Sequence, residues 1–286
     1  MLSEMLVRVK HRNLLVLLLA LGFFSPVTLA GGKLLATSAV GSIEGGAGGG
    51  LIPWAALGAY ATRDEMGWSA TLSRAQVRDF SLSSTALSGS FYDRVELSIA
   101  HLDFQGRSAA TQIGMDVAGV KLRLFGDLVY GEGPVISLGL QQHSLLDKAT
   151  ARAVGARHTS SSDFYISAAR AWIDGPGHRT FLLNLNLRNS EANQLGLLGF
   201  GGDQGGREWQ LELAAALFLD QRLAVGLEYR QKPDNLSALV EDDWTDVFIA
   251  YFPSNSVSIT AAYLQLGEIA GAKNQSGYYI SLQASF

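Results

Sequence analysis

The feature that most constrains this chain is a hydrophobic alternation with a period of two, which recurs over most of its length. In the last ten residues, one face carries Tyr278, Ile280, Leu282, Ala284 and Phe286, and the polar residues between them form the other face. Strict alternation is typical of a β-strand with one apolar and one wet face. The chain therefore ends in a strand that separates an apolar environment from a polar one.

Thirteen segments show this alternation, each roughly ten residues long. A tilted strand needs about this length to cross a bilayer, whereas strands of globular proteins average five or six residues. The repeat therefore predicts an all-β, antiparallel transmembrane β-barrel. The segments are 54–62, 67–75, 84–91, 94–104, 117–126, 135–143, 163–172, 180–188, 208–219, 222–232, 244–252, 256–266 and 277–286.

The links between these segments alternate between brief and long, as outer-membrane barrels alternate short periplasmic turns with longer extracellular loops. The brief links are 62–67, 92–94, 174–179, 220–221 and 253–256; the long ones are 105–116, 144–162, 189–206, 232–243 and 267–276, with 127–134 intermediate. All five tryptophans fall near expected strand ends, where aromatic girdles form.

The strand number depends on the glycine-rich region before residue 54. Bacterial barrels usually have an even number of strands, so thirteen segments require one more. Lys33–Val40 is the best candidate, and we expect about fourteen strands. The alternative is twelve, with Lys33–Val40 inside the lumen and one weak hairpin absent. The expected division is a signal peptide at 1–30, a first strand or plug at 31–53 and the barrel at 54–286.

The first thirty residues have the pattern of a secretory signal. Arg8, Lys10 and Arg12 precede an apolar run from Leu14 to Phe24, and cleavage is expected after about Ala30. The chain has no cysteine, which excludes a disulfide scaffold and a thiolate metal site. Its low charge content argues against nucleic-acid binding. We expect a protein of the cell outer membrane.

Charged residues at inward positions of the expected strands define the candidate lumen. Because both signs occur, they predict either a wet channel with a transverse field or a lumen closed by ion pairs. Asp103 and Arg170 fit neither face. The lumen-facing candidates are Arg94, Glu96, Lys121, Arg123, Arg188, Glu208, Glu212, Glu228 and Arg230, accompanied by Asn184, Asn186 and Gln210.

No pattern predicts catalysis, a metal site or a cofactor. The glycine run at 45–50 lacks the lysine and the following helix of a phosphate loop. His143 and Ser144 are adjacent in a strand, so they point to opposite faces and cannot form a nucleophile–base pair. The acidic residues 241–243 and Asp246 lack the spacing of a calcium loop and are expected in a solvated loop.

Two resemblances agree with the barrel. The alternating end at Phe286 resembles the C-terminal signal by which outer-membrane proteins are recognised for insertion, which implies the barrel-assembly machinery as a partner. The stretches 31–37, 43–45, 48–51, 53–55 and 92–98 resemble domain-of-unknown-function family 3034 of Gram-negative bacteria. That family implies an exported barrel and no known activity.

The leading functional hypothesis is a passive channel or transporter for small polar solutes. The alternative is a structural or interaction barrel with residues 31–53 packed inside as a plug. An outer-membrane hydrolase and a soluble periplasmic β-sandwich are less favoured. Outer-membrane lipid and lipopolysaccharide are the expected surroundings.

Overall fold

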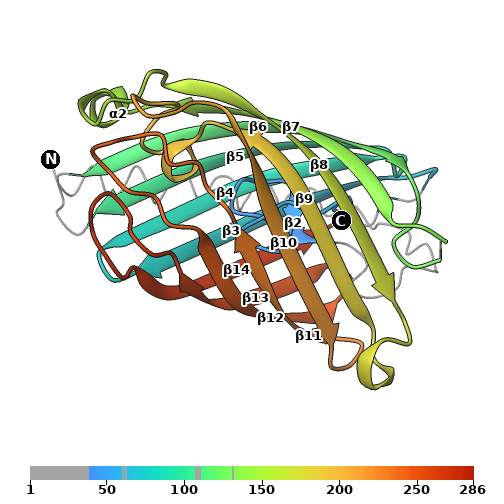
Figure 1. Cartoon of the computed structure of the whole chain (residues 1–286). Helices are drawn as coiled ribbons and strands as arrows, with labels where there is room; N and C mark the ends of the chain where they lie inside the picture. The colour runs from blue at the N-terminus through green and yellow to red at the C-terminus, as the bar shows by residue number, and fades with distance from the viewer. Residues whose placement is uncertain (1–38, 60, 62, 107–110, 131) are drawn as a thin grey trace, which may run out of the picture.

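The computed structural model describes residues 39–59, 61, 63–106, 111–130 and 132–286. Twelve antiparallel strands form one closed barrel, in which each strand pairs with its neighbours in sequence and β14 pairs with β3. A small hairpin of β1 (Val40–Gly41) and β2 (Ala47–Gly48) lies inside it. Figure 1 shows this blue segment within the barrel.

The barrel strands coincide with twelve of the thirteen predicted segments. They are β3 (Met66–Val77), β4 (Phe80–Phe91), β5 (Val95–Gly106), β6 (Gln112–Phe125), β7 (Val135–Leu145), β8 (Ser160–Trp172), β9 (Phe181–Ser190), β10 (Glu208–Phe218), β11 (Leu223–Arg230), β12 (Trp244–Ser254), β13 (Val257–Gln265) and β14 (Ser276–Ser285).

The preferred count of fourteen strands is wrong, and the alternative of twelve is correct. The described residues of 54–62 form no barrel strand, because Trp54, Ala55 and Ala56 are buried inside the barrel and bond to its wall. The predicted signal peptide at 1–30 and most of Lys33–Val40 lie outside the described residues. The alternation that begins at Trp54 reflects packing within a lumen and not a face turned to lipid.

Within the described residues, helical structure is confined to the links between strands. It comprises α2 (Lys148–Ala153) and two short 3₁₀ turns, η1 (Pro176–His178) and η2 (Asn193–Gly196). In the described part of the chain, no helix is long and apolar enough to span a bilayer.

The two ends of the barrel differ in their links. The end where β3 begins and β14 ends has links such as 92–94, 219–222 and 255–256, and the intermediate link 127–134 also falls there. The opposite end has the long links 146–159, 191–207, 231–243 and 266–275, although β3 and β4 are joined there by only two residues. By the usual asymmetry of such barrels, we name these the periplasmic and extracellular ends.

The outer surface carries an apolar belt. Outward side chains such as Leu97, Ile99, Leu185, Val247 and Ile280 are 39 to 63% exposed, which in water would be a large apolar patch. A closed barrel leaves no strand edge with unpaired backbone groups, and only helices and closed barrels meet that requirement in lipid. Belt and closure together make this a transmembrane β-barrel.

Aromatic rings border the belt, although two predicted girdle residues do not take part. Trp68 and Trp172 are exposed near the periplasmic end, and Trp209 is exposed near the extracellular end. Trp54 and Trp244 are buried and face inward. Four of the five tryptophans therefore mark strand ends, as expected, but their sequence positions do not indicate the side of the wall, and Trp54 lies in no barrel strand.

The alternation on β5 reverses its polarity part of the way along the strand. Near the periplasmic end, Leu97 and Ile99 face outward and Glu96 and Ser98 face inward. Beyond them His101 and Asp103 face outward, and the inward residues are Ala100, Leu102 and Phe104. This reversal explains why Asp103 fitted neither face: it faces outward, above the apolar belt.

The hydrophobic alternation on neighbouring strands changes its polarity at the same level of the barrel. On β6, Asp116 faces outward opposite His101, with Met115 and Val117 inward, while nearer the periplasm Val120 faces outward and Lys121 inward. The barrel thus has a membrane section, apolar outside and charged inside. On β3 to β6 its extracellular section has the opposite arrangement, as in a water-soluble β-barrel, whereas the inward residues of β7 to β9 stay polar there, among them His143, Asp163 and Arg188.

The boundary between the membrane section and the extracellular section predicts that a new charge on the outer surface destabilises the barrel in the first section but not in the second. Leu185→Arg places a guanidinium in the belt and should lower the free energy of unfolding by about 2–4 kcal/mol. Gln142→Arg, on the outer face of β7 beyond the boundary, should change it by less than about 0.5 kcal/mol. Urea unfolding in lipid vesicles measures both, and equal losses would contradict the assigned boundary.

Candidate functional site

The lumen of the membrane section is filled by residues 39–59, which we call the plug. Its first residue lies at the periplasmic end, where Gln283 Nε2 donates to Ala39 O at 3.5 Å. Its last residue returns there, because Ala59 packs against Gly67 at the start of β3. The plug therefore enters and leaves by the same opening, and its tip, residues 42–45, reaches inward as a turn closed by Gly45 N and Ser42 O.

Glu44 at this tip holds the centre of the site. Its carboxylate accepts from Arg230 Nη1 at 2.6 Å and lies 3.5 Å from Arg188 Nη2. Its other oxygen, Oε1, lies 3.0 Å from His143 Nε2. The carboxylate is fully buried, so these partners replace the water that an ionised group would otherwise require.

Wall carboxylates hold the two guanidinium groups in place. Arg188 Nε lies 2.7 Å from Glu212 Oε1, and its Nη1 lies 3.3 Å from Asp163 Oδ2. Arg230 Nε lies 3.4 Å from the same Glu212 oxygen. We call Glu44, His143, Asp163, Arg188, Glu212 and Arg230 the arginine cluster. All six are buried, and β7 to β11 each contribute one wall residue.

A second ion pair binds the backbone of the plug. Lys121 Nζ lies 3.1 Å from Glu96 Oε1, and both side chains are buried. Glu96 also accepts from the backbone N–H groups of Ala47 and Gly58, at 2.9 and 2.8 Å. Lys121 donates to the carbonyls of Ala47 and Ala56. The pair thus satisfies hydrogen-bonding groups of the buried plug backbone.

Three further wall residues grip the return half of the plug. Glu228 accepts from Leu51 N at 2.7 Å and from the indole of Trp54 at 3.2 Å. Asn184 Oδ1 accepts from Ala55 N at 2.9 Å, and Asn186 Nδ2 donates to the carbonyl of Pro53. The plug backbone approaches the wall so closely that glycine is needed at some positions. A Cβ at Gly49, for example, would lie 2.1 Å from Glu228 Oε1.

Six of the nine predicted lumen residues are buried inside the barrel: Glu96, Lys121, Arg188, Glu212, Glu228 and Arg230. The other three lie at the rims. Arg94 is exposed at a periplasmic turn, Arg123 pairs there with Asp93, and Glu208 is exposed where β10 begins at the extracellular end. Alternation gave these three the inward parity, but the wall there is open to water.

Sequence reasoning missed Glu44, His143 and Asp163. A signal existed for the first, since Glu44 is the only charged residue between Lys33 and Arg63. An isolated charge in a glycine-rich apolar stretch indicates a buried partner. His143 and Asp163 carried no such signal, because only the strand register brings them next to Arg188.

The histidine–serine pair and the acidic residues have structural positions. His143 faces the lumen and Ser144 the outside. Glu241 is buried and pairs with Lys232 at 3.2 Å, contrary to the expected solvated position. Asp246 faces inward and is buried. Among the described residues, no group of three or more histidine and carboxylate side chains is arranged to hold a metal ion.

The C-terminal strand contributes to closure of the barrel. Tyr278, Ile280 and Leu282 are about half exposed on the outer face, and Ala284 and Phe286 are half-buried. Phe286 and Trp68 exchange two backbone hydrogen bonds, at 2.6 and 2.9 Å.

Loops 191–207, 231–243 and 266–275 form a cap over the extracellular end. Gln194 joins all three: its N–H donates to Glu241 Oε1 at 2.8 Å, its side-chain oxygen accepts from Lys232 Nζ, and its amide nitrogen donates to Glu268 O. Burial raises the pKa of Glu241, against the opposing effect of Lys232. Burial likewise lowers the pKa of Lys232, against the effect of Glu241.

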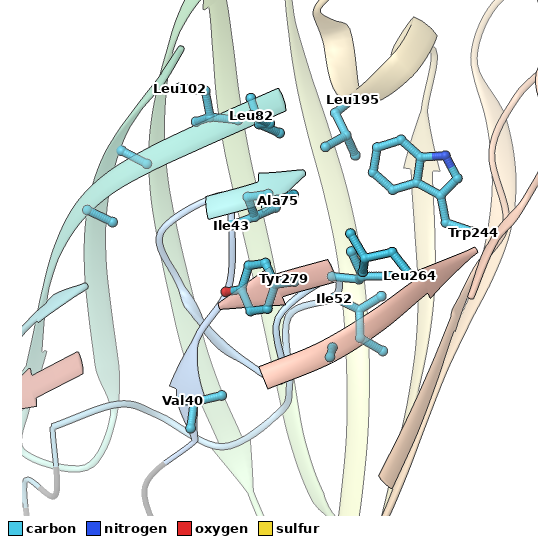
Figure 2. Close-up of a cluster of buried hydrophobic side chains, with 14 of the residues drawn as sticks. Val40, Ile43, Ile52, Ala75, Leu82, Leu102, Leu195, Trp244, Leu264 and Tyr279 are labelled. Carbon is cyan, nitrogen blue, oxygen red and sulfur yellow. The ribbon is translucent and has the colours of Figure 1, made fainter. Parts of the chain in front are cut away.

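Between the plug and the cap lies a small apolar cavity of about 30 Å³, which we call the chamber. Ile43 and Leu51 of the plug, wall residues such as Leu82 and Leu264, and Leu197 and Ile269 of the cap line it. Figure 2 shows Ile43 and Ile52 among these wall side chains, with Leu195 of the cap nearby. The lumen is therefore closed at two levels.

Comparison with known proteins identifies a family and a fold. A family model described as "Protein of unknown function (DUF3034)" matches residues 37–283. No match was found among curated proteins.

Several solved barrels are similar in structure. A KdgM porin has 11% identity and a TM-score of 0.50, covering 76% of this chain and 99% of the porin. The same porin in complex with disordered oligogalacturonate has 11% identity, the same coverage and a TM-score of 0.51. A NanC porin has 8% identity and a TM-score of 0.46, covering 77% of this chain and 98% of the porin.

The close fit at Gly49 gives a test of plug docking. Gly49→Val should displace the plug, because the new side chain would overlap Glu228 and the ring of Trp54. We expect an intact barrel on heat-modifiability gels, with the plug now cleaved by added protease. Gly133→Val is the matched control, since no atom lies within 4 Å of a Cβ there. Equal protease resistance in the two variants would contradict tight docking.

Proposed function

The chain belongs to the DUF3034 family, and we propose that it is an outer-membrane channel held closed by its own plug in the state described here. The barrel itself is of the porin-like outer-membrane type. The observation that carries the proposal is the way the plug is held. The charged wall residues bind the plug and not only one another.

Three properties of the plug favour withdrawal over permanent filling. Both of its ends lie at the periplasmic opening, so it can leave without threading through the barrel. Six of its 21 residues are glycine from 41 to 50, and another is Gly58, which allows the backbone to refold. Its polar contacts to Glu96, Lys121 and Glu228 can be replaced by water.

Withdrawal would leave a wall with charges of both signs. Twelve strands lie between small barrels that are filled by side chains and sixteen-stranded barrels with aqueous channels. Glu96, Lys121, Glu212 and Glu228 would then face the passage. This wall supports diffusion of small polar solutes, and we propose no catalytic step.

The surroundings follow from the same proposal. Outer-membrane lipid and lipopolysaccharide would contact the apolar belt and the polar outer face beyond it. The barrel-assembly machinery would recognise the terminal alternation of Tyr278, Ile280, Leu282, Ala284 and Phe286. Export would remove residues 1–30.

A permanently closed structural barrel is the second candidate. The burial of the whole arginine cluster favours it, because removing one partner from a buried ion pair typically costs about 3–5 kcal/mol. The two candidates differ in whether the plug leaves while the barrel remains folded.

Deletion of residues 40–58 tests the channel. We expect the deletion variant to give steady conductance in planar bilayers, because the wall left behind is no longer filled and the cap loses the apolar contacts with Ile43 and Leu51 that hold it across the chamber. The intact protein should be closed, with rare openings. A folded, heat-modifiable deletion variant without conductance would reject the channel.

A cross-link provides a second test that leaves the chain complete. A Cβ at Gly46 would lie 3.9 Å from Ser98 Oγ, and the chain has no cysteine of its own. Gly46→Cys with Ser98→Cys should therefore form a disulfide between plug and wall. Oxidation should abolish openings and reductant should restore them, whereas openings that persist in the oxidised protein would contradict plug movement.

A further inference from the structure

The tip of the plug presents two neighbouring residues of different character to different parts of the lumen. Glu44 inserts its carboxylate between Arg188 and Arg230, while Ile43 lines the chamber. Ser84 Oγ donates to the carbonyl of Ile43 at 2.8 Å and so fixes the backbone between them. The tip therefore combines one carboxylate with one apolar group.

Withdrawal of the plug would leave the arginine pair short of one anion. Arg188 would keep Glu212 and Asp163, and Arg230 would keep only Glu212. Of the cluster, Arg230 thus depends most on Glu44, which contacts its Nη1 at 2.6 Å. A buried guanidinium group binds a carboxylate well, because its planar set of N–H donors matches the two carboxylate oxygens. One monoanionic carboxylate would restore the contacts that Glu44 had made.

The same movement would enlarge the chamber next to this site. Ile43 and Leu51 both line the chamber and both belong to the plug, so their space is released with Glu44. The remaining lining is almost entirely hydrocarbon, from wall residues such as Phe104 and Leu264 and cap residues such as Leu197. An apolar cavity of this kind stays dry and takes apolar guests.

The guanidinium of Arg230 connects the two regions. Its Nη1 donates both to Glu44 Oε2 and to the carbonyl of Leu51, whose side chain lines the chamber. A carboxylate held by Arg230 can therefore place an attached apolar group in the chamber. A sugar acid would expose its hydroxyl groups to hydrocarbon there, which is unfavourable without hydrogen-bond partners.

We propose that the chamber and the Arg188–Arg230 pair form a binding site for small carboxylic acids with an aromatic or alkyl body, and that Ile43 and Glu44 occupy it as an internal substitute for this ligand. The proposal rests on the plug-gated channel and names the class of its solute. Such an acid would compete with the plug and favour the open state.

Cysteine labelling measures this competition in the complete protein. Ser42 is buried in the plug, its hydroxyl has no hydrogen-bond partner, and the chain contains no cysteine. Ser42→Cys is therefore a mild change that makes maleimide labelling a measure of plug withdrawal. The protein is reconstituted in lipid nanodiscs and labelled with or without each of three probes.

The probes separate the two halves of the site. 3-Phenylpropanoate carries both the ring and the carboxylate, 3-phenylpropan-1-ol only the ring, and propanoate only the carboxylate. We expect the first to accelerate labelling about tenfold, since hydrogen bonds to charged groups are worth at least that factor. The other two should change the rate by less than about twofold.

Substitutions assign the effect to the cluster. Glu44→Gln removes the internal anion and should lower the concentration of 3-phenylpropanoate needed for half-maximal acceleration. Arg230→Gln should abolish the acceleration while the barrel stays heat-modifiable. Glu208→Gln changes an exposed glutamate at the rim and should behave as the parent.

Each outcome decides a separate point. Equal acceleration by the alcohol would exclude recognition by the arginines, and equal acceleration by propanoate would exclude the chamber. No acceleration by 3-phenylpropanoate would overturn the proposed ligand class. The conductance of the variant lacking residues 40–58 is measured without ligand, so it still decides whether the barrel is a channel.

Discussion

The interaction on which the closed state depends is the burial of a carboxylate between two guanidinium groups. Glu44 has no access to water, so its charge is tolerated only because Arg188 and Arg230 lie within 3.5 and 2.6 Å. The guanidiniums in turn need Glu212 and Asp163. The plug is thus part of the charge balance of the wall, and its position is specified by these ion pairs together with the close fit at glycines such as Gly49.

Along β3 to β6, the wall of the barrel consists of two sections with opposite sidedness. In the membrane section, lipid outside and a charged lumen inside require outward apolar and inward polar residues. In the extracellular section, water lies outside, and the inward residues Leu82, Leu102 and Phe104 pack against the plug tip and the cap. In the proposed channel, this change would give a solute two environments in series along these strands, an apolar one followed by a charged one.

Most of the barrel could be predicted from the sequence because alternation is a direct record of two different environments. Twelve segments were recognised, and six of nine lumen candidates are buried. The failures share one cause: alternation records that two faces differ, without saying which lies inside. Trp54 belongs to an alternating stretch that packs within the lumen and not against lipid. Asp103 faces outward at a level where the outer surface meets water. Glu208 has the inward parity, but it lies at a rim where both sides of the wall meet water.

The sequence by itself determined the strand segments, the all-β class and the side-chain parity of each strand, since these depend on residues adjacent in the chain. Tertiary structure alone decided that twelve strands close the barrel and that residues 39–59 fill it. It also decided that Glu44 meets Arg230, 186 residues away. Such pairings depend on closure and strand register, which are set by the sum of many weak contacts around the barrel and leave no local pattern.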